Sequence, residues 1–389
     1  MCSFSLISSW PMKSSSCPGR RFTNVGSSEG CSSMIRSVGI MRRSYRRRIM
    51  PVNHDYTFAD KGRNFRYHFL MMSKGKGAKS AVAIGTFDGV HIGHQRILDR
   101  LNDVASKKSL QRIAYAFVFP PRLTVQAKTR GLLLSEEAKL KLLIRHVDRV
   151  ERVSFEDVSR ISAESFIRDI IIAHLKAKVI VVGSNFRFGH DRTGDTFLLR
   201  KICNEESTAT IVVPPVVIDG SPVSSTRIRQ LISQGRVEDA AALLGRHPIL
   251  VGRVMHGDRL GRKIGFPTAN LAIDERILLP SDGIYLAHAF WNGGWSPGLL
   301  YVGTRPTVHG TDRRIEVHLI AGGDQFDERD RAATRDLYGK IMEIHLVQKL
   351  RDDQHFATLK LLRQQIEHDI ECARGVLATS DEPQGPIVT

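Results

Sequence analysis

The chain has 389 residues, too many for one ordinary hydrophobic core, so its length predicts two domains and an additional segment. Hydrophobic residues make up 42% and charged residues 25%, as in ordinary globular proteins. No run of about 18 apolar residues occurs, which argues against a membrane-spanning helix. The scattered cysteines exclude a disulfide framework and a metal-ligand spacing, and they indicate a reducing compartment: Cys2, Cys17, Cys31, Cys203 and Cys372.

The net charge of +17 is concentrated in one segment of the chain. Residues 1–80 hold 15 Lys and Arg against Glu29, Asp55 and Asp60, which gives +12 of the total. The other 309 residues carry only +5, an ordinary balance for an enzyme that acts on anionic substrates. The charge therefore does not indicate a nucleic-acid-binding protein.

Residues 1–78 contain Ser clusters and an Arg-rich stretch but little periodicity. This composition favours a disordered basic extension. Two other interpretations stay open: a targeting segment, since the stretch is rich in Arg and Ser, and a true start at Met50, Met71 or Met72.

A first domain is expected over residues 79–235, where apolar runs alternate with helical patterns. This alternation predicts an α/β domain with a parallel sheet covered on both faces. The expected strands are 81–84, 114–119, 179–182 and 211–217, and the expected helices are 93–105, 139–145, 163–175 and 226–233.

A second domain is expected over residues 236–378, and a disordered tail over 379–389. After a short helix at 237–244 the pattern becomes β, with Gly, Pro and Asp between the apolar runs. This texture predicts a small antiparallel barrel or sandwich, closed by an amphipathic helix at 353–374. The expected strands are 249–255, 283–290, 298–302, 315–319 and 341–347.

The strongest motif is GTFDGVHIGH at residues 85–94, between a predicted strand and a predicted helix. Its glycines permit a tight turn, and the free N–H groups of a helix start suit phosphate. His91 and His94 can reach the same phosphates and stabilise charge that develops on them. The alternative, an incidental glycine-rich turn with two surface histidines, fits this strand-to-helix context poorly.

This motif resembles the HxGH signature of nucleotidyltransferases, in the form found in the FAD synthetase module of bacterial bifunctional riboflavin kinase/FAD synthetases. VGSNFRFGHDRTGD at 182–195 and SSTRIRQL at 224–231 also resemble that module. The resemblance implies three sets of site residues. Catalysis is expected of His91, His94 and Arg227, phosphate binding of Gly85, Phe87, Asp88, Gly89, Gly93, Ser225 and Thr226, and flavin binding of Asn185, Phe186, Arg187 and Arg192.

Two positions depart from the pattern of this family. Asn185 stands where the family usually has Asp, and Pro120-Pro121 stands where a Pro-His-Pro element is common. These changes leave open a chain whose adenylyl transfer is weak or lost.

No G-x-x-x-x-G-K-[ST] sequence occurs, so phosphoryl transfer requires another phosphate cradle. The candidate is GDRLGRKIGFPTAN at 257–270, which combines glycines, cations and a rigid Pro. Thr268 and Asn270 offer oxygen ligands two residues apart, as Mg²⁺ on ATP phosphates requires. Taken alone, the stretch could also be a solvated basic loop before a strand.

The same stretch resembles the nucleotide loop and PTAN motif of riboflavin kinases, and GTRPTVHG at 303–310 and IEVHL at 315–319 follow in the expected order. The resemblance implies a six-stranded β-barrel with a C-terminal helix. Glu316 would be the general base, Thr268 and Asn270 the metal ligands, and Arg305 a flavin contact. ATP or phosphate binding is implied for Gly257, Gly261, Lys263, Gly265 and Pro267. The stretch between His318 and Asp336 is longer and more charged than the family suggests.

The combined prediction is an enzyme with two active sites, which phosphorylates riboflavin to FMN and adenylylates FMN to FAD. ATP is the expected co-substrate and Mg²⁺ the expected cofactor, with no nucleic-acid or membrane partner. Three other classes are weaker alternatives: an HxGH transferase for another substrate, a single-function enzyme with one decayed site, and a nucleic-acid-binding protein. The cytoplasm is the default location, residues 1–70 leave an organellar destination open, and the oligomeric state is not readable.

Overall fold

The computed structural model describes residues 56–60, 63–67, 78–118, 131–256, 261, 264–307, 310–320, 337–378 and 385–388. All of them fall within one compact unit, Ile49–Thr389. The described residues do not include Gly257 and Lys263, which were predicted to bind phosphate, nor Pro120 and Pro121. They also do not include the side chain of Arg305. In the described part of the chain, no helix combines the length and the apolar character that crossing a bilayer requires.

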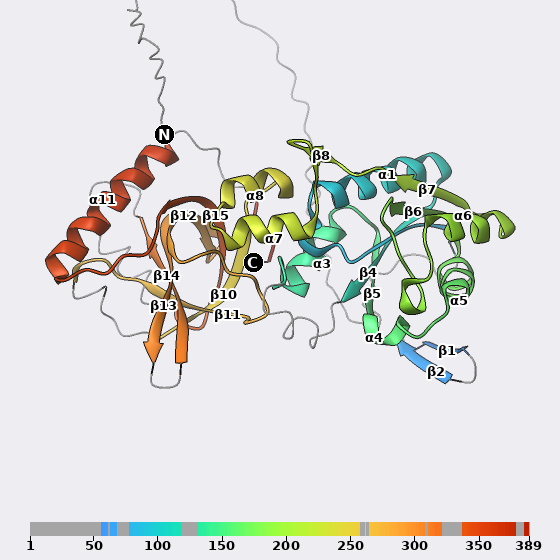
Figure 1. The fold of residues 1–389 in the computed structure, drawn as a ribbon, viewed down its shortest axis with the longest axis horizontal. Helices are drawn as coiled ribbons and strands as arrows, with labels where there is room; N and C mark the ends of the chain where they lie inside the picture. The colour runs from blue at the N-terminus through green and yellow to red at the C-terminus, as the bar shows by residue number, and fades with distance from the viewer. Residues whose placement is uncertain are drawn as a thin grey trace, which may run out of the picture. The chain divides into compact units, whose positions relative to one another are not determined.

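The first domain is built on a five-stranded sheet, and every neighbouring pair of its strands is parallel. The order across the sheet is β5-β4-β3-β6-β7, so the apolar run before the histidine motif forms the central strand. Figure 1 labels β4, β5, β6 and β7 of this sheet. The strands are β3 (Ser80–Gly85), β4 (Gln111–Val118), β5 (Arg149–Ser154), β6 (Ala177–Gly183) and β7 (Ala209–Val213).

Helices cover both faces of this sheet, because alternate residues of each strand point to opposite sides. Val82 and Ile84 join a buried cluster with η2 (Phe166–His174) and α6 (Thr196–Glu205). Ala81 and Ala83 face the other way, where their small side chains admit α1 (Ile92–Lys108) and α3 (Glu136–Ile144). The predicted α/β class is therefore confirmed. The remaining helices of the domain are η1 (Asp88–Val90), α4 (Phe155–Val158), α5 (Ala163–Ser165), η3 (His190–Arg192), α7 (Ser225–Ser233) and α8 (Val237–Leu244).

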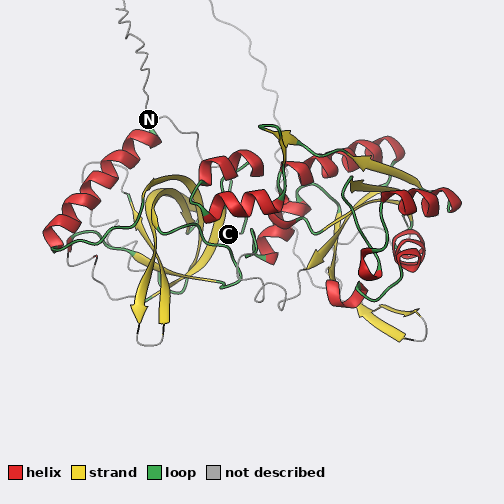
Figure 2. Ribbon diagram, viewed as in Figure 1, coloured by secondary structure: helices red, strands yellow, loops and turns green. Residues whose placement is uncertain are grey.

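The second domain is a closed antiparallel barrel, whose strands are drawn in yellow in Figure 2. The order around the barrel is β10-β11-β14-β13-β12-β15. Its interior is filled by alternate apolar residues, among them Leu300, Val317 and Ile344. The six strands and the C-terminal helix that the resemblance implied are confirmed. The strands are β10 (Ile249–Met255), β11 (Ala269–Ile273), β12 (Gly283–Trp291), β13 (Gly294–Thr307), β14 (Gly310–Leu319) and β15 (Ile341–Arg351), and the helix is α11 (Leu359–Leu377).

Several local predictions were wrong. The strand expected at 211–217 is two elements, β7 and the short β8 (Val217–Ile218), and Pro214 and Pro215 lie between them. The helix expected at 163–175 is mostly the π-helix η2. β5, α6 and β9 (Ser221–Pro222) were not predicted, nor was the N-terminal hairpin of β1 (Tyr56–Asp60) and β2 (Arg63–Tyr67).

The disorder predicted for residues 379–389 does not hold at 385–388. Ile387 and Val388 are buried, and their backbone N–H groups donate hydrogen bonds to the Glu343 carboxylate on β15. Sequence composition could not reveal this, because the partner lies 44 residues earlier in the chain.

Two candidate active sites

The histidine motif begins where β3 ends, at an unusual backbone turn. Phe87 and Val90 have positive φ values of 49° and 40°, and Gly89 has φ 80°. A Cβ on Gly89 would lie 2.8 Å from Leu133 Cδ1, so only glycine fits there. Backbone in this region costs free energy and is found mainly at functional sites. The turn places His91 at the N-cap of α1, where its side chain accepts from the His94 N–H.

His91 and His94 lie face to face, with ring centroids 3.7 Å apart and an interplanar angle of 18°. Burial, followed by the charge of the nearby Arg246 guanidinium, lowers the pKa of His91 to about 4. Burial, followed by the charge of His91, holds the pKa of His94 well below its usual value. Both rings are therefore neutral near pH 7. The buried Nδ1 of His94 has no hydrogen-bond partner among the described residues, which suits a donor or acceptor from a ligand.

Asp88 is part of the framework of this site. Its carboxylate is 3% exposed, accepts a hydrogen bond from the Leu133 N–H at 3.2 Å and forms an ion pair with Arg229. Burial raises the pKa of Asp88, against the opposing effect of Arg229. The side chain predicted to bind phosphate is thus already engaged in bracing the turn.

The start of α7 is joined directly to the same turn. Ser225 Oγ donates to the Asp88 carbonyl at 2.9 Å, while Ser224 caps the helix by accepting from the Arg227 N–H. Thr226 is exposed beside them. Two helix N-termini, those of α1 and α7, therefore lie together as the phosphate prediction required.

Arg227, the arginine predicted to be catalytic, is held elsewhere. Its Nη1 donates to the carbonyls of Ile218 (2.9 Å) and Ser221 (3.0 Å) on the β8–β9 hairpin. Arg229, two residues later, is the arginine on the side of Asp88. Sequence reasoning missed Arg229, although its i, i+4 spacing from Ser225 places both on one face of α7.

Arg246, in the connection between α8 and β10, also contacts the histidine turn. Arg246 donates to the carbonyls of Gly89 (2.6 Å) and Val90 (3.4 Å), and Gln95 on α1 donates to Leu244 (2.9 Å). Burial, and then the charge of Arg145, lowers the pKa of Arg246 to about 10. This residue was also not anticipated from the sequence.

The residues predicted to bind flavin follow β6, the neighbour of β3, so they lie at the same carboxyl edge of the sheet. Asn185 is exposed, and a Cβ on Gly183 would lie 3.3 Å from its Oδ1. The Phe186 ring stacks on Phe188 with centroids 5.2 Å apart. Arg187 is paired with Asp195 at 3.1 Å, and Arg192 is exposed with φ 59°.

The second site lies on the outer face of the barrel, because Ile315 and Val317 point into its core. Thr268 Oγ1 donates to Glu316 Oε2 at 2.8 Å, and Arg314 lies 3.4 Å from Glu316 Oε1. Asn270 on β11 pairs directly with Glu316 on β14, so these side chains share one face. Three residues predicted separately are thus brought together.

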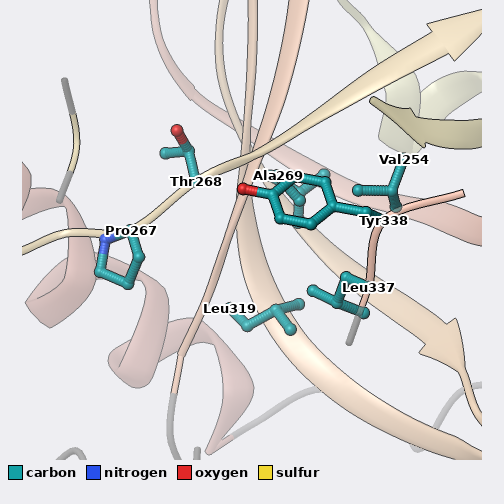
Figure 3. Close-up of a pocket in the computed structure, with 8 residues that line it drawn as sticks. Val254, Pro267, Thr268, Ala269, Leu319, Leu337 and Tyr338 are labelled. Atoms are coloured by element: carbon teal, nitrogen blue, oxygen red, sulfur yellow. The ribbon is translucent and has the colours of Figure 1, made fainter. Parts of the chain in front are cut away.

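A pocket opens beside this row, lined by residues of three strands (β10, β11 and β14), the residues just before β11 and the turn before β15. Figure 3 shows Pro267 and Thr268 on one side of it and Leu337 and Tyr338 on the other. The Tyr338 ring stacks on His256 with centroids 3.8 Å apart. In the preceding loop Gly265 has a positive φ of 93°, and a Cβ on Gly261 would clash with the Phe266 carbonyl oxygen, which explains these two glycines. The lining is Val254, Pro267, Thr268, Ala269, Val317, Leu319, Leu337 and Tyr338.

An α/β domain with paired histidines at a helix start, joined to a barrel with a Thr–Glu pair, defines a two-domain transferase. The family model described as FAD synthetase matches residues 73–227, and that described as riboflavin kinase matches 244–377. The chain belongs to the bifunctional riboflavin kinase/FMN adenylyltransferase family.

Curated relatives of that name share both domains with this chain. One from Escherichia coli K12 is 37% identical over 298 residues, covering 75% of this chain and 91% of the relative. One from Pseudomonas fluorescens is 35% identical, with 76% and 93% covered. A crystal structure of a Streptococcus pneumoniae protein described as a macrolide-efflux protein aligns with a TM-score of 0.68 at 30% identity, covering 77% and 95%.

These findings confirm the predicted family, the fold of both domains, the flavin kinase and adenylyltransferase class of the enzyme, and ATP as its co-substrate. The predicted domain limits and the roles of single residues stay predictions.

Proposed function

We propose that this chain transfers the γ-phosphoryl group of ATP to riboflavin in its barrel and the adenylyl group of ATP to FMN in its α/β domain. The observation that carries the proposal is that one chain contains two sites whose side chains are already arranged for these reactions. One is the Thr268–Glu316 hydrogen bond, and the other is the stacked pair of His91 and His94 at the start of α1.

In the barrel, Glu316 would accept the proton of the riboflavin 5′-hydroxyl as that oxygen attacks the γ-phosphorus and ADP leaves. Thr268 would hold the carboxylate in position, since the two already share a hydrogen bond of 2.8 Å. Arg314 Nη1 lies 3.4 Å from Glu316 Oε1 and would help to keep the carboxylate in place.

Thr268 and Asn270 fit the proposed Mg²⁺, because hydroxyl and amide oxygens are ligands of hard cations. The described residues contain no group of three His, Cys, Asp or Glu that could hold a metal by itself, so ATP phosphates would supply the remaining oxygens. When bound, the ion would offset the charge of the transferred phosphoryl group.

In the α/β domain, a phosphate oxygen of FMN would attack the α-phosphorus of ATP, forming FAD and releasing pyrophosphate. The neutral His91 and His94 would contact the phosphates by hydrogen bonds, and the N-termini of α1 and α7 would stabilise the developing charge. The ion pair of Asp88 with Arg229 and the hydrogen bond of Ser225 to Asp88 would hold the two helix N-termini next to each other.

A second candidate is a riboflavin kinase with weak or lost FAD synthesis. It is favoured by Asn185, a neutral amide at the end of β6 where the family usually has a carboxylate. Wild-type protein that converts riboflavin and ATP to FMN, with no FAD, would support this alternative.

The decisive measurement is chromatography of the products formed from riboflavin or FMN with ATP and Mg²⁺. Glu316→Gln should lower FMN formation by about 10²–10⁴-fold, because it removes the general base. The same variant should still convert supplied FMN to FAD. His94→Asn should lower the formation of FAD from FMN and leave the formation of FMN from riboflavin unchanged.

Glu371→Gln on the exposed side of α11 is the matched control and should change neither reaction. If Glu316→Gln makes FMN at the wild-type rate, Glu316 is not the base. If neither product forms in the wild type, the proposed function is wrong.

A further inference from the structure

Glu343 is a buried carboxylate on the outer face of the barrel. It lies on β15 between Met342 and Ile344, which point into the core, and its side chain is 0% exposed. No step of the proposed reactions uses it. A buried charge costs several kcal/mol unless partners compensate it, so its contacts reveal what this part of the surface is built to hold.

The partners of Glu343 come from two sources. His345 Nε2 lies 2.7 Å from Oε1. The Ile387 N–H donates to both oxygens at 2.9 Å and 3.0 Å, and the Val388 N–H donates to Oε2 at 2.6 Å. Burial raises the pKa of Glu343, but these hydrogen bonds outweigh it and the net pKa is lowered. The carboxylate thus binds two successive backbone N–H groups of the C-terminal segment, residues 385–388.

The opposite side of the C-terminal segment is held by the α/β domain. Lys141 on α3 donates to the Val388 carbonyl, and Arg145 just beyond α3 donates to the Pro386 carbonyl at 2.7 Å. The side chains of Ile387 and Val388 are part of a buried cluster that also contains Leu142 and Leu143 of α3 and Ile249 of β10. Pro386, Ile387 and Val388 together therefore contact both domains through backbone and side chains.

We propose that Glu343, Lys141 and Arg145 form a peptide-binding site whose ligand is the C-terminal segment of this chain, and that the bound segment holds the two catalytic domains together. The ligand class is a short extended apolar peptide that presents two successive N–H groups to a carboxylate. The fit rests on the three backbone hydrogen bonds, the two cations at its carbonyls, and the burial of both apolar side chains.

The first test supplies the segment in trans. A chain that ends at Gln384 is titrated with a fluorescent peptide of residues 385–389, and a peptide of the same residues in scrambled order is the control. We expect saturable binding of the native peptide alone, and no binding to the full chain, whose site is already filled. Glu343→Gln in the shortened chain should weaken binding by roughly tenfold or more, because it removes the charge that accepts three hydrogen bonds. Absence of binding, or equal binding of both peptides, would overturn the proposal.

The second test follows unfolding by calorimetry. Removal of residues 385–389 should lower the unfolding midpoint by roughly 5 °C or more or split one transition into two, because each lost kcal/mol shifts the midpoint by a few degrees. The native peptide should restore the full-chain profile.

If the shortened chain does not fold, full-length Glu343→Gln is compared with Glu371→Gln. We expect a lower midpoint for the first and an unchanged midpoint for the second. An unchanged profile in Glu343→Gln contradicts the proposal. A change of oligomeric state on removal of residues 385–389 also contradicts the proposal, because it would mean that the segment binds a second copy of the chain.

Discussion

Arg227 and Arg229 stand two residues apart on α7 and have different tasks. Arg227 ties the helix to the β8–β9 hairpin, and Arg229 forms the ion pair with the buried Asp88. The sequence motif predicted the cluster of hydroxyls and cations at this helix start. It could not show which arginine faces the histidine turn, because the face of α7 that meets the turn depends on packing against residues such as Leu133.

Arg229→Ala should destabilise the protein more than Arg227→Ala. Removal of Arg229 leaves the Asp88 carboxylate buried without its cation, which costs about 3 kcal/mol when the carboxylate stays ionised. Arg227→Ala removes hydrogen bonds near the surface and should cost about 1 kcal/mol. Urea unfolding of both variants, with FAD formation measured in parallel, checks this. Equal losses in the two variants would show that the ion pair does not brace the turn.

The buried histidine predicts a pH dependence of stability. His91 has a pKa of about 4 in the folded protein against 6.5 for the free side chain. Between these pH values the unfolded state binds the additional proton, so stability is lost as pH falls from 6.5 toward 4, by roughly 3 kcal/mol in full.

In urea unfolding between pH 7 and pH 5, His91→Asn should therefore show a smaller fall in stability than the wild type. Asn is chosen because it can also cap α1. Parallel curves for the two proteins would refute the assignment.

At the scale of elements, the sequence revealed the strands with continuous apolar runs and missed those stabilised by charge pairs. β3 and β6 were predicted because their residues are almost all apolar. β5 was missed because Arg149 and Glu151 interrupt its pattern, and only the fold shows that these two form a buried ion pair. Five of the six barrel strands were predicted from the pattern and β11 was not; the number of six came from the family resemblance, and the closing order was not predicted.

The helix α11 depends on a buried ion pair for its position on the barrel. Of its residues, Asp369 and Ala373 are buried, and Asp369 accepts a two-pronged pair from Arg351 at 2.8 Å and 2.9 Å. Asp369→Ala leaves the guanidinium uncompensated and should destabilise the docked helix by about 3 kcal/mol. Hydrogen exchange should then quicken in α11 and remain unchanged in α1. Unchanged exchange in α11 would show that its apolar contacts suffice.

At the scale of the whole molecule, the two domains share structural parts. The C-terminal segment contacts both, and Leu132 in the first domain bridges to Ile277 in the second. Neither contact could be predicted from the sequence, because the partners are separated by 44 residues or more and have no local pattern. The two-domain organisation itself was predictable, since each domain has its own periodicity.

The position of Arg246 in the chain limits where the gene could be divided between the two domains. The guanidinium that braces Gly89 and Val90 is encoded just upstream of the barrel, beyond the last helix that carries the adenylyltransferase motifs. A gene fragment that stops after α7 would encode every residue of those motifs and yet omit a cation that supports their turn. Exchange of domains among relatives would therefore have to carry Arg246 along with the first module, so a recombination point between Arg246 and β10 should be better tolerated than one between α7 and Arg246.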